Sequence, residues 1–170
     1  MTLTSRRNFL GATSLLGLST VLSGTFRAAA TPSGAFEVTY SDAEWHKRLT
    51  PGQYNVLRQE GTERPFTSPL NDEHRRGVFA CAGCGLDAYS SDTKFESHTG
   101  WPSFYAPLPN AIGTSTDTSF GTSRTEVHCS RCGSHLGHVF NDGPAPTGLR
   151  YCMNGVAMSF KADSVQGNRS

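Results

Sequence analysis

The pattern of apolar and polar positions along the chain changes near Gly77. Before this point, two segments predict short helices, one ending near Leu49 and one running from Pro51 to about Gly61. Each segment starts with a capping box, in which a side-chain acceptor is followed three residues later by glutamate or glutamine. The two boxes are Ser41 with Glu44 and Thr50 with Gln53. Pro51 suits the first helical position, because its missing N–H costs no hydrogen bond there.

After Gly77, short apolar or alternating segments bounded by glycine and proline predict β-strands. They cover residues 78–80, 94–97, 120–128, 136–140 and 149–160. In the last segment Arg150, Cys152 and Asn154 fall on one face, because successive side chains of a strand alternate. The pattern therefore predicts a mostly β fold with short N-terminal helices, a small antiparallel barrel or sandwich of short strands.

The first thirty residues differ from the rest and predict an export signal. Arg6 and Arg7 precede a mild apolar run over residues 9–22, and residues 28–30 offer a small-residue cleavage site. This order is typical of a twin-arginine signal peptide, which would take the protein through the Tat machinery to the periplasm or another extracytoplasmic location. The run is too short and polar for a membrane span of about 20 apolar residues, and an uncleaved anchor is the alternative.

The rest of the chain is expected to form one domain at residues 41–163, after a linker at 31–40 and before a flexible tail at 164–170. Of the fifteen Lys and Arg residues, three precede residue 31, whereas all fourteen Asp and Glu residues follow it. Acidic residues therefore slightly outnumber basic ones in the mature chain, which lacks the basic surface of a nucleic-acid-binding protein. We expect a monomer that does not bind nucleic acid.

Four of the five cysteines form two Cys-x-x-Cys-Gly motifs, Cys81 with Cys84 and Cys129 with Cys132. Such a motif is a tight turn that supplies half of a tetrahedral thiolate site, and Zn²⁺ favours four thiolates in a structural centre. A zinc ion would join two distant hairpins and stabilise the fold by closing a long loop. The alternatives are iron with the same ligands, or two disulfides, although two such short loops would not cross-link the domain.

Cys152 is the one cysteine left outside these motifs, and it follows Arg150 by two positions. A positive neighbour favours the thiolate, which is the nucleophilic form of cysteine. His135 and His138 are candidate general acids if their segment packs beside Cys152, and Asp142 could orient one of them. The simpler interpretations are a small buried cysteine and histidines that only form hydrogen bonds in the core or bind metal weakly.

A second concentrated stretch runs from Gly100 to Phe104. Trp101 and Phe104 flank a proline and could form the rigid apolar wall of a methyl-sized pocket near a nucleophile. Alternatively, the stretch is a hydrophobic turn that closes one end of a barrel.

Together these segments resemble one family, the peptide-methionine (R)-S-oxide reductases (MsrB). The match extends from about Ser41 to Phe160 and is carried by residues 56–66, 81–84, 93–97, 100–104, 129–140 and 148–154. The resemblance implies a compact β-rich fold with zinc held by the four motif cysteines. It also implies an oxidoreductase that returns the R epimer of methionine sulfoxide in oxidised proteins to methionine.

The resemblance further implies a role for each candidate residue. Cys152 would attack the sulfoxide sulfur and become a sulfenic acid. The residues that shape the site and help to protonate the sulfoxide oxygen would be His135, His138 and Asn154. The substrate would be held by Trp101, which cradles the methyl group on sulfur, together with Arg150 and Phe104.

The chain departs from the family pattern just before its Gly-Trp-Pro motif, at His98, where the family usually has glycine, and at Thr99. Many members carry a second, resolving cysteine two residues before the tryptophan of Gly-Trp-Pro, where this chain has Thr99. Because the other four cysteines are assigned to zinc, we expect an external thiol, thioredoxin-like or small, to reduce the sulfenic acid of Cys152. A smaller departure is Gly155, where a serine is common; we expect it to affect packing only.

A rival interpretation retains the zinc site but assigns no catalytic activity to the protein. In it, the chain is a non-catalytic, zinc-stapled module that binds oxidised or methionine-rich partners. Such a module has no need for Arg150, Cys152 and Asn154 on one strand face, so we favour the enzyme.

Overall fold

The computed structural model describes residues 36–119 and 121–164 of the chain. The export signal expected at residues 1–30 lies outside the described residues, as does nearly all of the expected tail. Residues 36–40, which were expected to belong to a linker, contact the domain, and the N–H of Val38 donates to the carbonyl of Arg131 at 3.0 Å. Within the described ranges, no helix is long and apolar enough to cross a membrane.

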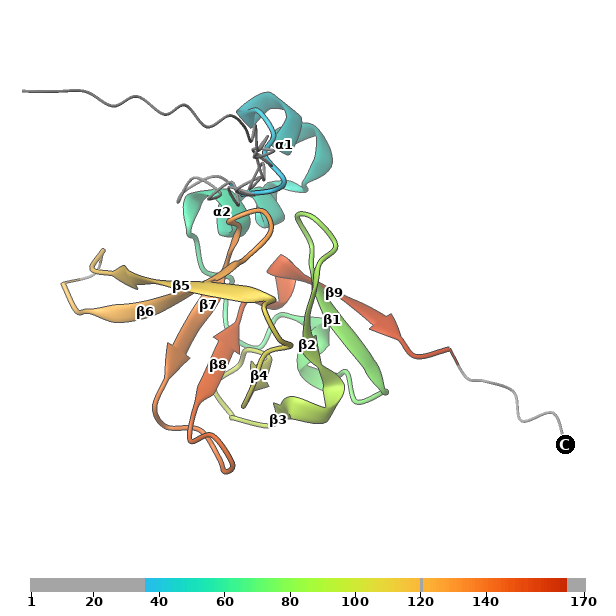
Figure 1. The fold of residues 1–170 in the computed structure, drawn as a ribbon, viewed down its shortest axis with the longest axis vertical. Coiled ribbons are helices and arrows are strands. Elements are labelled where there is room, and N and C mark those ends of the chain that lie inside the picture. Colours follow the sequence, from blue (N-terminus) through green and yellow to red (C-terminus); the bar gives the residue numbers. More distant parts are fainter. Residues whose placement is uncertain (1–35, 120, 165–170) are drawn as a thin grey trace, which may run out of the picture. The chain divides into compact units, whose positions relative to one another are not determined.

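Two helices open the described chain at the predicted positions. Both α1 (Asp42–Arg48) and α2 (Pro51–Gln59) begin with a complete capping box, which confirms the prediction. Their apolar side chains point inward, so that Trp45, Val56 and Leu57 are buried. In Figure 1 the two helices lie beside one another, and α2 contacts the strand β7 (His135–Phe140).

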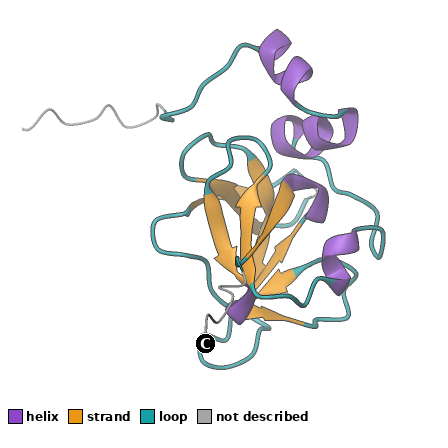
Figure 2. Cartoon of the chain, turned by 90° about the vertical axis from the view of Figure 1, so that its right-hand side faces the viewer, coloured by secondary structure: helices purple, strands orange, loops and turns teal. Residues whose placement is uncertain are grey.

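The described strands form two antiparallel sheets, with the helices outside them (Figures 1 and 2). The three-stranded sheet has the order β2 (Asp87–Ser90), β1 (Gly77–Cys81) and β9 (Met158–Ala162). The six-stranded sheet has the order β3 (Lys94–Phe95), β4 (Ser103–Phe104), β8 (Arg150–Met153), β7, β6 (Arg124–Cys129) and β5 (Ile112–Asp117). The predicted mostly β, antiparallel fold is confirmed, and β8, which carries Cys152, is an interior strand.

The single strand predicted for residues 149–160 is wrong. A 3-10 turn, η3 (Gly155–Ala157), separates β8 from β9 and carries the chain from the six-stranded sheet to the three-stranded one. The carboxylate of Glu63 accepts hydrogen bonds from the first two N–H groups of η3, which removes them from any strand ladder. Because Glu63 lies far away in the sequence, alternation of side chains alone could not reveal this break.

Three aromatic rings join the two sheets in the hydrophobic core. Phe79 of β1, Tyr89 of β2 and Phe104 of β4 are all fully buried. The Phe104 ring stacks on Tyr89 with centroids 4.5 Å apart and meets Phe79 at 5.0 Å. Phe104, expected to bind substrate, therefore packs in the core. Its neighbour Ser103 is the β4 residue paired with Cys152, and adjacent strand residues point to opposite faces.

Candidate active site and metal centre

The two Cys-x-x-Cys-Gly motifs form equivalent turns at the ends of β1 and β6. Cys81 ends β1 and Cys129 ends β6. In each turn the glycine after the second cysteine donates its N–H to the carbonyl of the first cysteine, at 2.8 Å for Gly85 and 2.9 Å for Gly133. These glycines have φ values of 73° and 66°, a left-handed conformation that favours glycine. The repeated turn explains why each half of the centre presents two sulfurs.

The four sulfurs converge as a tetrahedral metal site requires. All lie within 4.8 Å of one another, with 3.7 Å between Cys81 and Cys132 and 3.5 Å between Cys84 and Cys129. A zinc ion about 2.3 Å from each sulfur would hold them roughly 3.8 Å apart. Hydrogen bonds among the sulfurs lower the pKa of Cys84 and raise that of Cys129. The four cysteines can therefore hold a metal ion, and no disulfide links the cysteines of the described residues.

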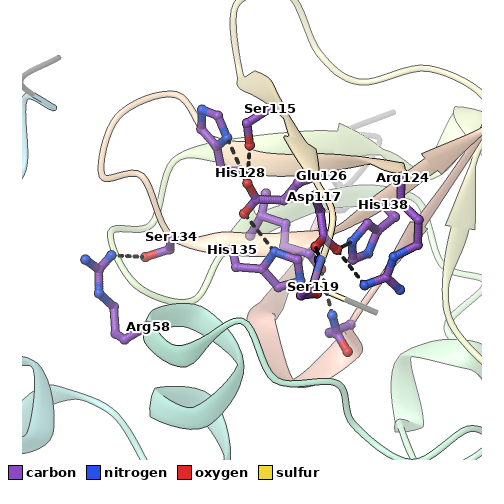
Figure 3. A network of polar contacts seen from close by, with 12 residues as sticks. Arg58, Ser115, Asp117, Ser119, Arg124, Glu126, His128, Ser134, His135 and His138 are labelled. Carbon is purple, nitrogen blue, oxygen red and sulfur yellow. Dashed lines mark hydrogen bonds and ion pairs between the residues drawn. The ribbon is translucent and has the colours of Figure 1, made fainter. Parts of the chain in front are cut away.

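Helix α2 supports one half of this centre. The Nη1 of Arg58 donates to the carbonyl of Cys132 and to the hydroxyl of Ser134, both at 3.3 Å (Figure 3). The Arg58 guanidinium also lies 4.8 Å from the centre of the Trp45 ring. One side chain thus connects both helices to the second cysteine motif.

Cys152 lies in β8 between two neighbouring strands. Ser103 of β4 and His138 of β7 are directly opposite it, and such pairs project to the same face of a sheet. Cys152 and His138 line a cavity of about 120 Å³ together with Thr62, Trp101, Arg124 and Asn154. A larger cavity of about 530 Å³ beside α2 and η3 has no cysteine or histidine in its wall. The smaller cavity is therefore the candidate active site.

Opposing effects act on the pKa of the Cys152 thiol. Burial raises its pKa above the usual value, whereas the Thr99 hydroxyl, the positive charge of Arg150 and the Ser103 hydroxyl lower it. The Oγ1 of Thr99 lies 3.8 Å from the Cys152 sulfur. Arg150 acts in the predicted direction, but its guanidinium is shared with Asp142 through two contacts of 2.9 Å. Burial outweighs these groups, so the pKa of Cys152 stays above its usual value.

His138 belongs to a charged network on β5 and β6 (Figure 3). Its Nε2 lies 2.8 Å from the Oδ2 of Asp117, the oxygen that also pairs with Arg124. The other carboxylate oxygen, Oδ1, accepts hydrogen bonds from the N–H and the hydroxyl of Ser119. The Ser119 hydrogen bonds, with those of His138 and Arg124, hold the pKa of Asp117 well below its usual range. Burial lowers the pKa of His138, and the Asp117 contact opposes that effect. Asp117 is thus the group that would stabilise a proton on this imidazole.

His135 lies behind the cavity. Its side chain is 2 % exposed, and its Nδ1 lies 2.9 Å from the Oε1 of Glu126 (Figure 3). Its ring meets the His138 ring edge-on, with centroids 5.3 Å apart. His138 therefore faces the cavity, while His135 supports it from the interior.

The carboxamide of Asn154 ties together three segments around the cavity. Its Nδ2 donates to the carbonyl of Leu136 at 3.1 Å, and its Oδ1 accepts from the N–H of Glu63 at 3.0 Å. The carbonyl of Glu63 accepts from the indole Nε1 of Trp101 at 3.1 Å. Asn154 and Trp101 are thus held in fixed orientations by the same short segment after α2.

Sequence reasoning missed several residues that complete this site. They are Thr62, Glu63, Asp117, Arg124 and Glu126. Only a weak indication of these residues was present in the sequence, because Arg124 and Glu126 lie on one face of the predicted strand at residues 120–128. The pairing of β5 with β6, which brings Asp117 opposite Arg124, could not be deduced from either segment alone.

Comparison with known proteins bears on the same residues. A family model described as the SelR domain matches residues 49–162. The protein named "Peptide methionine sulfoxide reductase MsrB" from Methanosarcina barkeri is 58% identical over 127 residues, which cover 74% of this chain and 89% of that protein. The protein of the same name from Leptospira interrogans is 53% identical over 129 residues, covering 75% and 98%. The chain therefore belongs to the SelR domain family, which its relatives identify as the MsrB family.

Proposed function

We propose that the protein reduces the R epimer of methionine sulfoxide in proteins to methionine, with Cys152 as the nucleophile. The observation that carries the proposal is the position of Cys152. It lies outside the four-sulfur centre, in a small cavity that it shares with His138 and Trp101. Family membership supports the activity, because the relatives named above are peptide methionine sulfoxide reductases.

The proposed reaction begins with attack of the Cys152 sulfur on the sulfoxide sulfur. His138, supported by Asp117, gives a proton to the sulfoxide oxygen as its bond to sulfur breaks. With a second proton from solvent the oxygen leaves as water, and the two sulfurs remain joined. A water molecule then attacks the Cys152 sulfur and breaks this bond, so that methionine leaves and Cys152 becomes a sulfenic acid. The sulfoxide is thereby reduced and the cysteine is oxidised by two electrons. The Trp101 ring forms the wall against which the substrate methyl group packs.

The second stage returns Cys152 to the thiol. A thiol from an external reductant, thioredoxin-like or small, attacks the sulfenic sulfur and displaces water, which leaves a mixed disulfide. A second thiol of the reductant then releases Cys152 and leaves the reductant as a disulfide. Thr99, the residue whose hydroxyl lies beside the Cys152 sulfur, has no thiol with which to form an internal disulfide.

Three further proposals concern the setting of this reaction. The four-cysteine centre binds Zn²⁺, whose role is to hold two turns together. The mature protein is a monomer. It is exported through the Tat machinery to an extracytoplasmic compartment, a proposal that Arg6 and Arg7 support. Replacing both arginines with lysine should retain the uncleaved protein in the cytoplasm, whereas export of that variant would contradict the proposal.

The test of the activity is a Cys152→Ser variant assayed for reductant-dependent loss of the R epimer. Turnover should disappear, while metal content and the unfolding transition stay unchanged, because Cys152 lies outside the metal centre. Persistent turnover in this variant would refute the assignment. Reductant-dependent turnover by the unsubstituted protein also separates the enzyme from a module that only binds oxidised partners.

A further inference from the structure

Three hydroxyl side chains form a continuous hydrogen-bonded chain that ends at the sulfur of Cys152. The Oγ1 of Thr99 lies 3.8 Å from this sulfur, and the Oγ of Ser97 lies 2.8 Å from Thr99. The Oγ of Ser103 lies 2.7 Å from Ser97. Ser103 is 1% exposed and is paired with Cys152 across β4 and β8. The steps described above make no use of these hydroxyls.

The loop between β3 and β4 has a backbone shape that directs Thr99 towards the sulfur. The residues on either side of Thr99, His98 and Gly100, have φ values of 57° and 94°. The N–H of His98 donates to the Oε1 of Glu96 at 2.7 Å, and the carbonyl of Gly100 accepts from the N–H of Phe66 at 2.7 Å. Both flanks of Thr99 are therefore held in place.

We propose that the hydroxyl of Thr99 stabilises the thiolate of Cys152, with Ser97 as the positioning residue between Thr99 and Ser103. This inference rests on the proposed function, since it gives a role in catalysis to the residue beside the nucleophile. It assigns to Thr99 a hydrogen bond to sulfur in the step before attack.

The hydroxyl chain can serve both protonation states of the sulfur, because each hydroxyl can donate one hydrogen bond and accept others. When Cys152 is a thiol, its S–H donates to Thr99, and the chain ends with Ser103 donating to the carbonyl of Trp101 at 3.2 Å. When Cys152 is a thiolate, the donors reverse and Thr99 donates to the sulfur. A charged sulfur is thereby satisfied in a site where burial disfavours charge.

The experiment measures the pH dependence of Cys152 alkylation by iodoacetamide in the reduced, metal-loaded protein. Thr99→Val removes the hydroxyl and keeps the side-chain shape, whereas Thr99→Ser keeps the hydroxyl. Below the pKa, we expect alkylation of T99V to be about tenfold slower, as expected for loss of one hydrogen bond to a charged group. T99S should stay within about twofold of the unsubstituted protein. Thr114→Val, an exposed substitution on β5, is the matched control.

Two further results decide the inference. The Ser97 hydroxyl contacts Thr99 and not the sulfur. Because Ser97→Ala removes only the support of Thr99, it should slow alkylation about two- to threefold. An unchanged alkylation profile in both T99V and S97A would overturn the inference, even if sulfoxide reduction declined, because Thr99 would then act through packing alone. Alkylation requires no sulfoxide turnover, so this outcome is independent of the C152S result that tests the proposed function.

Discussion

The chemistry of the site is divided between two half-buried side chains, Cys152 and His138. Cys152 has an uncharged, hydroxyl-rich surrounding on its β4 side, whereas His138 is bound to the Asp117 carboxylate. Nucleophilic attack needs a deprotonated sulfur, and departure of the sulfoxide oxygen needs a proton. Cys152 of β8 and His138 of β7 lie directly opposite one another. The hydroxyl of Thr99 contacts the sulfur, and the carboxylate of Asp117 contacts the imidazole.

Replacing Asp117 with asparagine tests whether its carboxylate supports His138 as the proton donor. The carboxylate raises the pKa of His138, so its removal should lower that pKa and leave less protonated imidazole at a given pH. The limb of the pH–rate profile that requires protonated His138 should move to lower pH. We expect kcat/KM at pH 7 to fall on the order of tenfold.

The control for this substitution is Asp163→Asn, which changes an exposed carboxylate that directly follows β9 and pairs with Arg76. Its profile should match that of the unsubstituted protein. If the Asp117→Asn profile keeps the same alkaline limb, Asp117 does not support the proton on His138.

At the level of elements, the contact between β7 and β8 fixes the distance between donor and nucleophile. Gly137 of β7 is paired with Met153 of β8 and lines the cavity. A Cβ at this position would lie 2.1 Å from the carbonyl oxygen of Cys152 and 3.0 Å from the Cα of Met153. The two strands can approach this closely only because residue 137 lacks a side chain.

Gly137→Ala should therefore destabilise the protein and weaken activity together. Forcing a methyl group against backbone atoms costs about 1–3 kcal/mol, which chemical unfolding can measure. Gly52→Ala in α2 is the matched control, since its nearest neighbour would be a Val156 methyl group at an ordinary 3.7 Å. Equal unfolding free energies for the two variants would contradict the proposed close approach of β7 and β8.

Elements that depend on local chemistry could be predicted from the sequence, and those that depend on distant partners could not. Both helices follow their capping boxes, and the repeated cysteine motifs identify the metal centre. The break at η3 depends on Glu63, about ninety residues earlier. The placement of Phe104 in the core depends on Tyr89 and Phe79, which belong to the other sheet.

In the folded domain as a whole, the proposed zinc joins the two sheets. Cys81 belongs to the three-stranded sheet and Cys129 to the six-stranded sheet, and each brings the second cysteine of its turn. Binding a metal between elements so distant in sequence restricts the unfolded chain, so the binding free energy contributes directly to folding.

Removing the metal should therefore destabilise the domain and reduce activity with it. We expect Cys84→Ser, or chelation of the unsubstituted protein, to lower the melting temperature by more than about 10 °C. Calorimetry with parallel metal analysis measures this. A metal-free protein that melts at the original temperature would show that the four sulfurs do not stabilise the fold.

A single turnover without reductant tests the role of Cys152 most directly. The reduced, metal-loaded protein is mixed with excess methionine-R-sulfoxide, and methionine, free thiols, protein mass and bound metal are measured. The proposed mechanism predicts about one methionine per protein, loss of about one thiol, a gain of about 16 Da on Cys152 and full retention of metal. Loss of two thiols with a disulfide between Cys152 and one of the four metal-centre cysteines, together with metal release, would contradict it.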